Sequence, residues 1–128
     1  MRILTDTHAM LWWLRDDSRL SRRARRILGD GANELVWSIA SSWEVAVKLG
    51  LGKLELGRPL HRLFADLVTR QGVVVLPISH EHCARIAELP LHHRDPFDRM
   101  LVAQAQEQGV PILTGDPKLA AYEVEIVW

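Results

Sequence analysis

Four acidic residues in this 128-residue sequence have the type and placement needed to bind a metal ion: Asp6, Glu44, Asp98 and Asp116. Two carboxylates about 5 Å apart repel each other by roughly 3 kcal/mol at an effective dielectric near 20, so a cluster needs protons or a counter-charge. Oxygen ligands are best satisfied by a hard cation such as Mg²⁺ or Mn²⁺. Such an ion can generate hydroxide from bound water and stabilise charge on a phosphodiester.

The predicted secondary structure can bring these acids to one end of the molecule. Asp6 ends an expected first strand, and Asp116 lies just past the fourth. Glu44 lies in the helix after the second strand, and Asp98 lies in the first turn of a helix that enters the sheet. Ligands of open parallel sheets bind beyond the carboxyl ends of the strands, so we expect all four acids at that edge.

The helix that carries Asp98 has a well-defined predicted start. Asp95 can accept hydrogen bonds from free backbone N–H groups, Pro96 suits the first helical position, and Asp98 follows three residues after the cap. Helix-starting chemistry alone is a sufficient reason for these residue types. Asp95 and Asp98 are therefore both candidates for the third acid of the cluster.

The rest of the chain alternates between strands and helices. Strands are expected at residues 3–4, 34–38, 73–76, 109–114 and 124–127, and helices at 9–14, 20–28, 38–49, 59–69, 79–87, from 95 onward and at 118–122. This alternation predicts an α/β fold with a parallel sheet covered on both faces. The run 73–76 is β-branched and apolar, which predicts a strand buried on both faces, and the apolar run 9–14 predicts a helix buried on most sides.

Length and composition predict a single globular domain, residues 1–128. Sixteen Lys and Arg residues balance sixteen Asp and Glu residues, so nucleic acid could bind only through a local basic patch. The single cysteine, Cys83, excludes an internal disulfide and fits a reducing compartment. The sequence shows no signal segment, and its longest apolar run is too short for a membrane span. We expect a cytoplasmic protein with no membrane association.

Several other residues have a structural and a functional interpretation. Trp12 and Trp13 can stack on bases but are more typical of a core or an interface. Four arginines between positions 22 and 26 can bind phosphates, although a solvated helix face is the favoured single explanation for them. Glu44 and Lys48 have the spacing of an ordinary exposed helical ion pair.

Two further site types are disfavoured by spacing. Residues 50–57 are rich in glycine but lack the GxxxxGK[ST] spacing of a phosphate loop and follow a helix rather than a strand. Histidines and the cysteine between positions 80 and 93 match no standard zinc pattern: His80, His82, Cys83, His92 and His93.

Four segments together resemble a known family. They are Ile3-Leu-Thr-Asp-Thr-His8, the segment from Ser38 to Trp43-Glu44, His93-Arg-Asp-Pro-Phe-Asp-Arg99 with Ala103-Gln-Ala105, and Leu113-Thr-Gly-Asp116. In this order and at this chain length they resemble the PIN-domain family, and within it the VapC-type ribonuclease toxins of bacterial toxin–antitoxin pairs. The resemblance extends over nearly the whole chain.

The resemblance implies a PIN-like three-layer α/β/α domain with a central parallel sheet and a Mg²⁺- or Mn²⁺-dependent endoribonuclease. By it, Asp6, Glu44, Asp98 and Asp116 are the catalytic, metal-binding acids, and water bound to the metal attacks the RNA. Asp98 is preferred over Asp95 because it heads the matching Asp-Arg-Met-Leu-Val-Ala segment. Asp95 is then the helix cap and an auxiliary ligand at most. Thr7 and Thr114 would orient water or carboxylates.

The resemblance also implies partners: an RNA substrate, a second copy of the chain in a homodimer, and a small VapB-like antitoxin through which operator DNA is bound. Rival enzyme classes fit less well. A haloacid-dehalogenase-like phosphatase needs an aspartate where His8 stands, and a response-regulator receiver needs one where Leu76-Pro77 stands. A PIN-like module that binds RNA or protein without turnover is the alternative that stays open.

Overall fold

The structure, a computed structural model, describes residues 1–128. Its strands are β1 (Arg2–Thr5), β2 (Glu34–Ser38), β3 (Val74–Leu76), β4 (Ile112–Leu113) and β5 (Ile126–Val127). Its α-helices are α1 (Thr7–Arg15), α2 (Arg22–Gly29), α3 (Ile39–Gly50), α4 (Leu60–Thr69), α5 (His80–Glu88) and α6 (Pro96–Gln108), and a 3₁₀ helix, η1, covers Pro117–Ala121. The predicted order of strands and helices is confirmed, although β4 and β5 are shorter than predicted.

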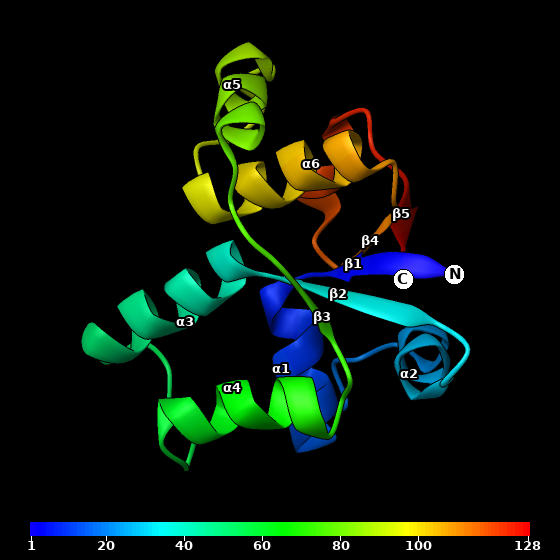
Figure 1. Cartoon of the computed structure of the whole chain (residues 1–128), viewed down its shortest axis with the longest axis vertical. Helices are drawn as coiled ribbons and strands as arrows, with labels where there is room; N and C mark the ends of the chain where they lie inside the picture. The colour runs from blue at the N-terminus through cyan, green and yellow to red at the C-terminus, as the bar shows by residue number, and fades with distance from the viewer.

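The five strands form one sheet in the order β3-β2-β1-β4-β5, and every pair is parallel (Figure 1). Thr5 of β1 pairs with Leu113 of β4, and Leu4 pairs with Val36 of β2. The carboxyl ends of β1, β2 and β4 therefore lie side by side. The predicted α/β class with a parallel sheet is confirmed.

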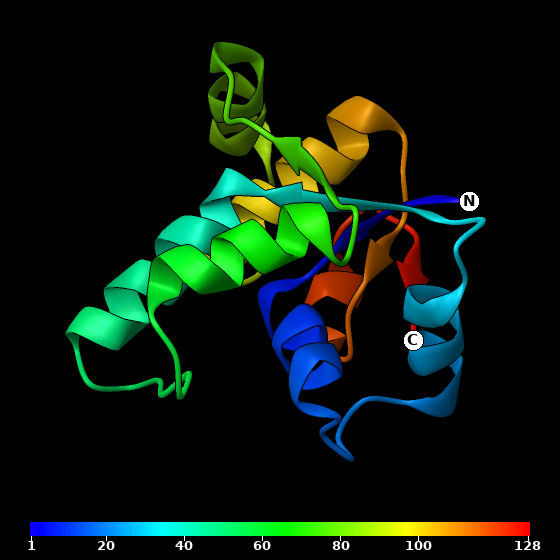
Figure 2. The same ribbon diagram turned by 60° about the horizontal axis from the view of Figure 1, so that its bottom comes forward.

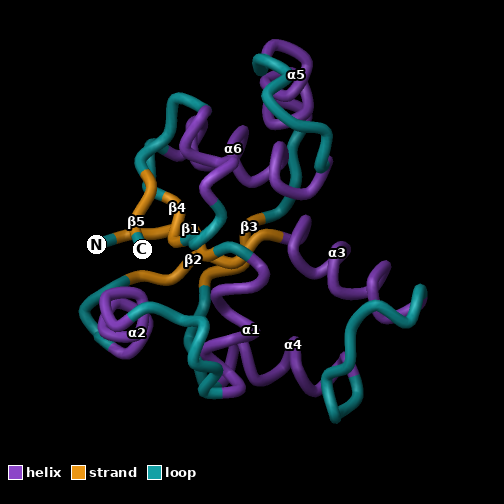
Figure 3. The backbone as a smooth tube through the Cα atoms, turned by 180° about the vertical axis from the view of Figure 1, so that it is seen from behind, coloured by secondary structure: helices purple, strands orange, loops and turns teal.

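Alternate residues along the strands pack into two separate cores, as expected when side chains point to opposite faces of a sheet. On one face Ile3, Trp37 and Leu113 pack with residues of α1, α2 and α4. On the other face Leu4 and Ile112 pack with residues of α6 and η1. Figures 2 and 3 show the helices divided between the two sides of the sheet, which gives the three-layer arrangement.

The prediction that residues 73–76 form a strand buried on both faces is wrong. Val74 and Val75 are each 40% exposed, because β3 is an edge strand with β2 as its only neighbour. A β-branched apolar run has the same local pattern in a central and in an edge strand. The position of a strand in the sheet is decided by chain topology, which that pattern does not contain.

Three helix predictions need correction. The segment predicted as a short α-helix at 118–122 is η1, a 3₁₀ helix that starts at Pro117. The helix predicted from residue 20 begins at Arg22, because Ser21 caps it by accepting a hydrogen bond from Ala24. Within the run 9–14 of helix α1, residues 9–11 are buried, whereas Trp12, Trp13 and Leu14 are partly exposed. None of the helices has the length and apolarity needed to cross a membrane.

Candidate active site

Asp6 lies at the junction between β1 and α1 and is 7% exposed. As the N-cap of α1 it accepts a hydrogen bond from the Ala9 backbone N–H at Oδ1, over 2.6 Å. Its second oxygen, Oδ2, accepts a short hydrogen bond from the Thr114 hydroxyl. Burial raises the pKa of the Asp6 carboxyl, and these two hydrogen bonds act in the opposite direction. The carboxylate is thus fixed in position by groups that stabilise its charged form.

Thr114 connects Asp6 to Asp116. Its side chain is buried, and Oγ1 accepts a hydrogen bond from the Asp116 backbone N–H over 3.1 Å while donating to Asp6. Asp116 caps η1 by accepting from the Lys118 backbone N–H over 2.9 Å. Because Thr114 follows the β4 residue that pairs with Thr5, the sheet register places both aspartates at the same edge.

Asp98 lies in the first turn of α6, where the predicted cap is present. Asp95 Oδ1 accepts hydrogen bonds from the backbone N–H groups of Phe97 and Asp98, over 2.9 and 3.1 Å. Asp98 Oδ2 lies 3.4 Å from His93 Nε2, and His93 Nδ1 lies 2.8 Å from the Tyr122 hydroxyl. The Asp98 side chain is 20% exposed.

The pKa of the Asp98 carboxyl is raised to about 7, above its ordinary value of 3.8. Burial is the largest cause, followed by the negative charges of Asp95, Glu44, Asp116 and Asp6. Three of these charges come from elements far apart in the sequence. Asp98 therefore lies within the electrostatic range of all three other predicted site acids.

Glu44 is buried in α3, where its side chain is only 3% exposed. Its Oε2 atom lies 2.5 Å from Lys48 Nζ and 4.0 Å from His8 Nε2. Lys48 Nζ and His8 Nε2 are 3.5 Å apart. The predicted ion pair between Glu44 and Lys48 is present, but the prediction that it is exposed is wrong, because the Glu44 side chain is buried. Two basic side chains face its carboxylate at the site.

The acids are neighbours, but no three His, Cys, Asp or Glu side chains are grouped closely enough to hold an ion as they stand. Their oxygens have other partners instead: Asp6 accepts from Thr114 and Ala9, and Glu44 accepts from Lys48. The donor set still fits a hard divalent cation, since it consists of carboxylate oxygens, and their repulsion adds to burial in raising the pKa of Asp98. Cation binding would require Glu44 to exchange Lys48 for the ion.

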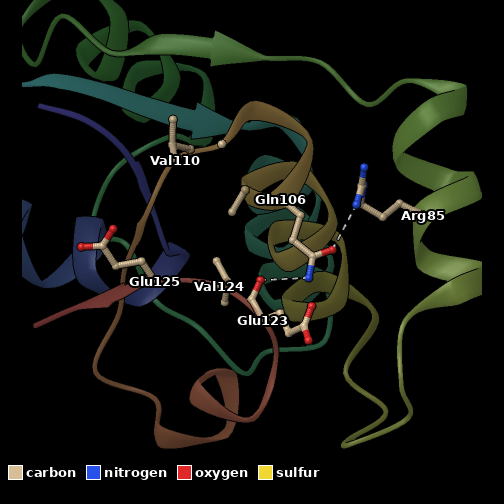
Figure 4. Close-up of a pocket in the computed structure, with 8 residues that line it drawn as sticks. Arg85, Gln106, Val110, Glu123, Val124 and Glu125 are labelled. Carbon is tan, nitrogen blue, oxygen red and sulfur yellow. Dashed lines mark hydrogen bonds between the residues drawn. The ribbon is translucent and has the colours of Figure 1, made fainter.

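A hollow of about 370 Å³ lies at the opposite edge of the sheet, between α6 and the segments that enter β4 and β5. It is lined by residues that include Arg85, Gln106 and Glu123, and Figure 4 shows Gln106 bonded to Arg85 and to the Glu123 carbonyl. None of the four site acids lines this hollow. Ligands of such sheets bind beyond the carboxyl ends, so the acid cluster is the better candidate site.

The sequence matches the family model of the PIN domain over residues 3–125. The chain belongs to the PIN-domain family. This confirms the family to which the four sequence segments pointed, and the matched range contains all four acids of the candidate site.

Curated relatives of this PIN domain are ribonucleases by name. Ribonuclease VapC22 of Mycobacterium tuberculosis is 28% identical over 121 residues, which cover 94% of this chain and 91% of that protein. Ribonuclease VapC16 of the same organism is 37% identical over 60 residues, which cover 47% of this chain and 43% of that protein. The predicted resemblance to VapC-type proteins is confirmed by these relatives.

Solved structures share the fold of this PIN domain. VapBC2 from Rickettsia felis, bound to a DNA fragment from its promoter, aligns with a TM-score of 0.73 at 13% identity over 99% of this chain and 98% of that one. VapBC-1 from nontypeable Haemophilus influenzae aligns with a TM-score of 0.70 at 18% identity, over 99% of this chain and 97% of that one. FitAcB from Neisseria gonorrhoeae aligns with a TM-score of 0.66 at 21% identity, over 98% of this chain and 96% of that one.

Sequence patterns did not single out three basic residues of the site. His8 and Lys48 approach Glu44, and His93 connects Asp98 to Tyr122. His93 belongs to the matching segment 93–99 and to the residues that fit no zinc pattern, and neither observation predicted its contacts with Asp98 and Tyr122. The i to i+4 spacing of Glu44 and Lys48 was a signal for their contact but not for its burial.

Proposed function

We propose that this chain, acting as one PIN domain over residues 1–128, is a Mg²⁺- or Mn²⁺-dependent endoribonuclease and the toxin of a toxin–antitoxin pair in the cytoplasm. The observation that carries the proposal is the convergence of four acids at the carboxyl edge of the sheet. Burial and the charges of Asp95, Glu44, Asp116 and Asp6 raise the pKa of Asp98, as expected where carboxylates are assembled at one site. The names of the curated relatives support the ribonuclease assignment.

In this proposal Asp6, Glu44, Asp98 and Asp116 hold the cation. A bound divalent cation would supply activated water and offset the charge of the phosphodiester. Thr114 keeps Asp6 oriented through its hydroxyl and fixes the backbone of Asp116. Such supporting hydrogen bonds tune the affinity of a metal site. Lys48 lies beside Glu44 at the site, and its ammonium group would be available to pair with a phosphate oxygen of the RNA if Glu44 held the cation.

The proposed partners follow from the toxin role. The structures with the same fold include VapBC complexes, so we propose a small antitoxin protein as the inhibitor of this chain and a second copy of the chain as its dimer partner. Contact with operator DNA would then occur through the antitoxin. No membrane partner is part of this proposal.

Cleavage of total RNA by the purified chain tests the function. The assay is run with Mg²⁺, with Mn²⁺ and with a chelator, and it compares wild type with Asp6→Asn. We expect discrete fragments with either metal, and at least 100-fold slower cleavage in the variant or with chelator. The fragment ends would identify the target RNA.

A matched control is Asp30→Asn, because Asp30 is an exposed aspartate at the end of α2, away from the acids. Cleavage that survives in Asp6→Asn at the rate of the control would contradict the assignment of Asp6. Intact RNA under all conditions, with binding retained, would favour the module that binds RNA without turnover.

A further inference from the structure

Three aromatic rings and one guanidinium group form a continuous ladder along α1. The His8 and Trp12 rings lie one helical turn apart, with centroids separated by 6.1 Å and planes inclined by 32°. The edge of Trp128 meets Trp12 at a centroid distance of 6.0 Å. The Arg19 guanidinium lies over the Trp12 ring, 4.8 Å from its centroid. We call this set of four side chains the aromatic ladder.

Two members of the aromatic ladder, His8 and Trp128, lie beside segments that carry acids of the candidate site. His8 Nε2 lies 4.0 Å from Glu44 Oε2. Trp128 rests on Gly115, where an added Cβ would lie 2.7 Å from the indole carbons Cε2 and Cζ2. Gly115 separates Thr114 from Asp116, so the indole covers the loop that carries one of the acids. A nucleotide chain leaving the acids on this side would therefore meet the ladder.

Arg19 is held in its position over Trp12 by Asp17. The carboxylate of Asp17 accepts hydrogen bonds from Arg19 Nε over 3.1 Å and from Nη2 over 2.7 Å. The Arg19 Nη1 group has no hydrogen-bond partner, and the side chain is 62% exposed. Aromatic rings and guanidinium planes both stack on unpaired RNA bases, and a guanidinium N–H donates well to phosphate oxygens.

We propose that the aromatic ladder binds an unpaired base of single-stranded RNA beside the acid cluster, and that Arg19 donates from Nη1 to the adjoining phosphate. The proposal rests on the ribonuclease function proposed above. It assigns a task to the exposed surface of these side chains. Trp12 and Trp128 also pack by one side against the core below α1, and packing alone would need neither the Arg19 clamp nor the exposed His8 ring.

Fluorescence anisotropy of a labelled 12-nucleotide single-stranded RNA tests the base contact. Chelator prevents cleavage during the titration, and an abasic ribose–phosphate oligomer of equal length is the comparison probe. We expect wild type to bind the normal RNA about tenfold more tightly than the abasic probe, and Trp12→Leu to lose that preference. Trp12→Phe keeps an aromatic ring and should retain most of it. Arg19→Gln should weaken binding of both probes and reduce its salt dependence by about one counterion.

His8→Ala provides a second test that does not depend on the folding of the Trp12 variants. The His8 side chain is 49% exposed, so its removal should leave the fold intact. It should weaken base-dependent binding at an unchanged melting temperature. Equal affinity of wild type for normal and abasic RNA would overturn the ladder while leaving the nuclease proposal intact. Base-dependent binding that needs Trp12, in a chain that never cleaves RNA with metal, would support the ladder and defeat the nuclease proposal.

Discussion

The ammonium group of Lys48 lies 2.5 Å from Oε2 of Glu44, whose side chain is almost completely buried. A buried carboxylate without a partner is costly, so the contact with Lys48 offsets part of the cost of burying Glu44. A cation that had Glu44 as a ligand would also supply a positive charge to this buried carboxylate. In the proposed site, lysine and metal would therefore compete for one carboxylate.

Replacing Lys48 tests this competition. In chelator, Lys48→Met leaves Glu44 unpaired, and we expect the free energy of unfolding to fall by about 1–3 kcal/mol. Saturating Mg²⁺ should restore most of the loss, because the ion supplies the missing positive charge. Urea unfolding in chelator and in Mg²⁺ measures the loss of stability and its recovery. Lys53→Met, at an exposed lysine, is the control. An equal loss in the two conditions would show that Glu44 does not bind the ion.

The raised pKa of Asp98 predicts a pH dependence of stability. With a folded pKa of about 7 and an ordinary value of 3.8, the metal-free folded chain holds this proton more tightly than the unfolded chain. Stability therefore falls as pH rises from about 4 to about 7 and then levels off. Asp98→Asn should be more stable than wild type at pH 8 in chelator by about 1–2 kcal/mol after solvent screening, and unchanged near pH 4. Urea unfolding of wild type and Asp98→Asn at both pH values measures this difference in stability. If the variant were more stable by the same amount at pH 4 and at pH 8, titration of Asp98 would not be the cause.

Metal binding should be visible in thermal unfolding without any substrate. Mg²⁺ or Mn²⁺ at 100 times its dissociation constant stabilises the folded chain by about 2.7 kcal/mol and raises the melting temperature. The rise should be larger at pH 8 than at pH 6, because below pH 7 protons compete with the ion for Asp98. Glu44→Gln should reduce the rise, whereas the exposed Glu88→Gln should not. A wild-type chain without a response would exclude a metal site at these acids.

Thr114 is expected to matter through the direction of its hydroxyl. Thr114→Val preserves shape but removes the donor to Asp6 and the acceptor for the Asp116 N–H. We expect cleavage or metal affinity to fall about 10–100-fold, with a smaller effect in Thr114→Ser. Cleavage rates at several metal concentrations separate loss of affinity from loss of rate. Wild-type kinetics in Thr114→Val would show that Asp6 keeps its orientation unaided.

Local patterns predicted much of the fold. Asp95 caps α6 as predicted, because capping depends on residues that are close in sequence. The alternation of strands and helices predicted the parallel sheet. The exposure of Val74 and Val75 was missed because the order of strands is a property of the whole chain.

The candidate site shows the same division. Asp6 and Asp116 could be placed at strand ends from the sequence, since sheet geometry fixes where carboxyl ends lie. The inward orientation of Glu44 depends on how α3 is rotated against α1 and α6, and its spacing from Lys48 is compatible with either face. The approach of His8 to Glu44 joins two helices and has no signature within either.

The hydrogen bond from Thr114 to Asp6 joins residues 108 positions apart. Domains fold during synthesis as their chain emerges from the ribosome, beginning with the N-terminal part. Asp6, Glu44 and Asp98 are therefore made before the segment that contains Thr114 and Asp116. The loop closed by the hydrogen bond between Thr114 and Asp6 is among the longest that the chain can form. A nascent chain shorter than about 116 residues outside the ribosome lacks the last acid and the hydroxyl that orients the first. In the proposed site, the fourth acid and the hydroxyl that orients the first are therefore the last parts to be made, and the four acids can come together only after Asp116 has emerged.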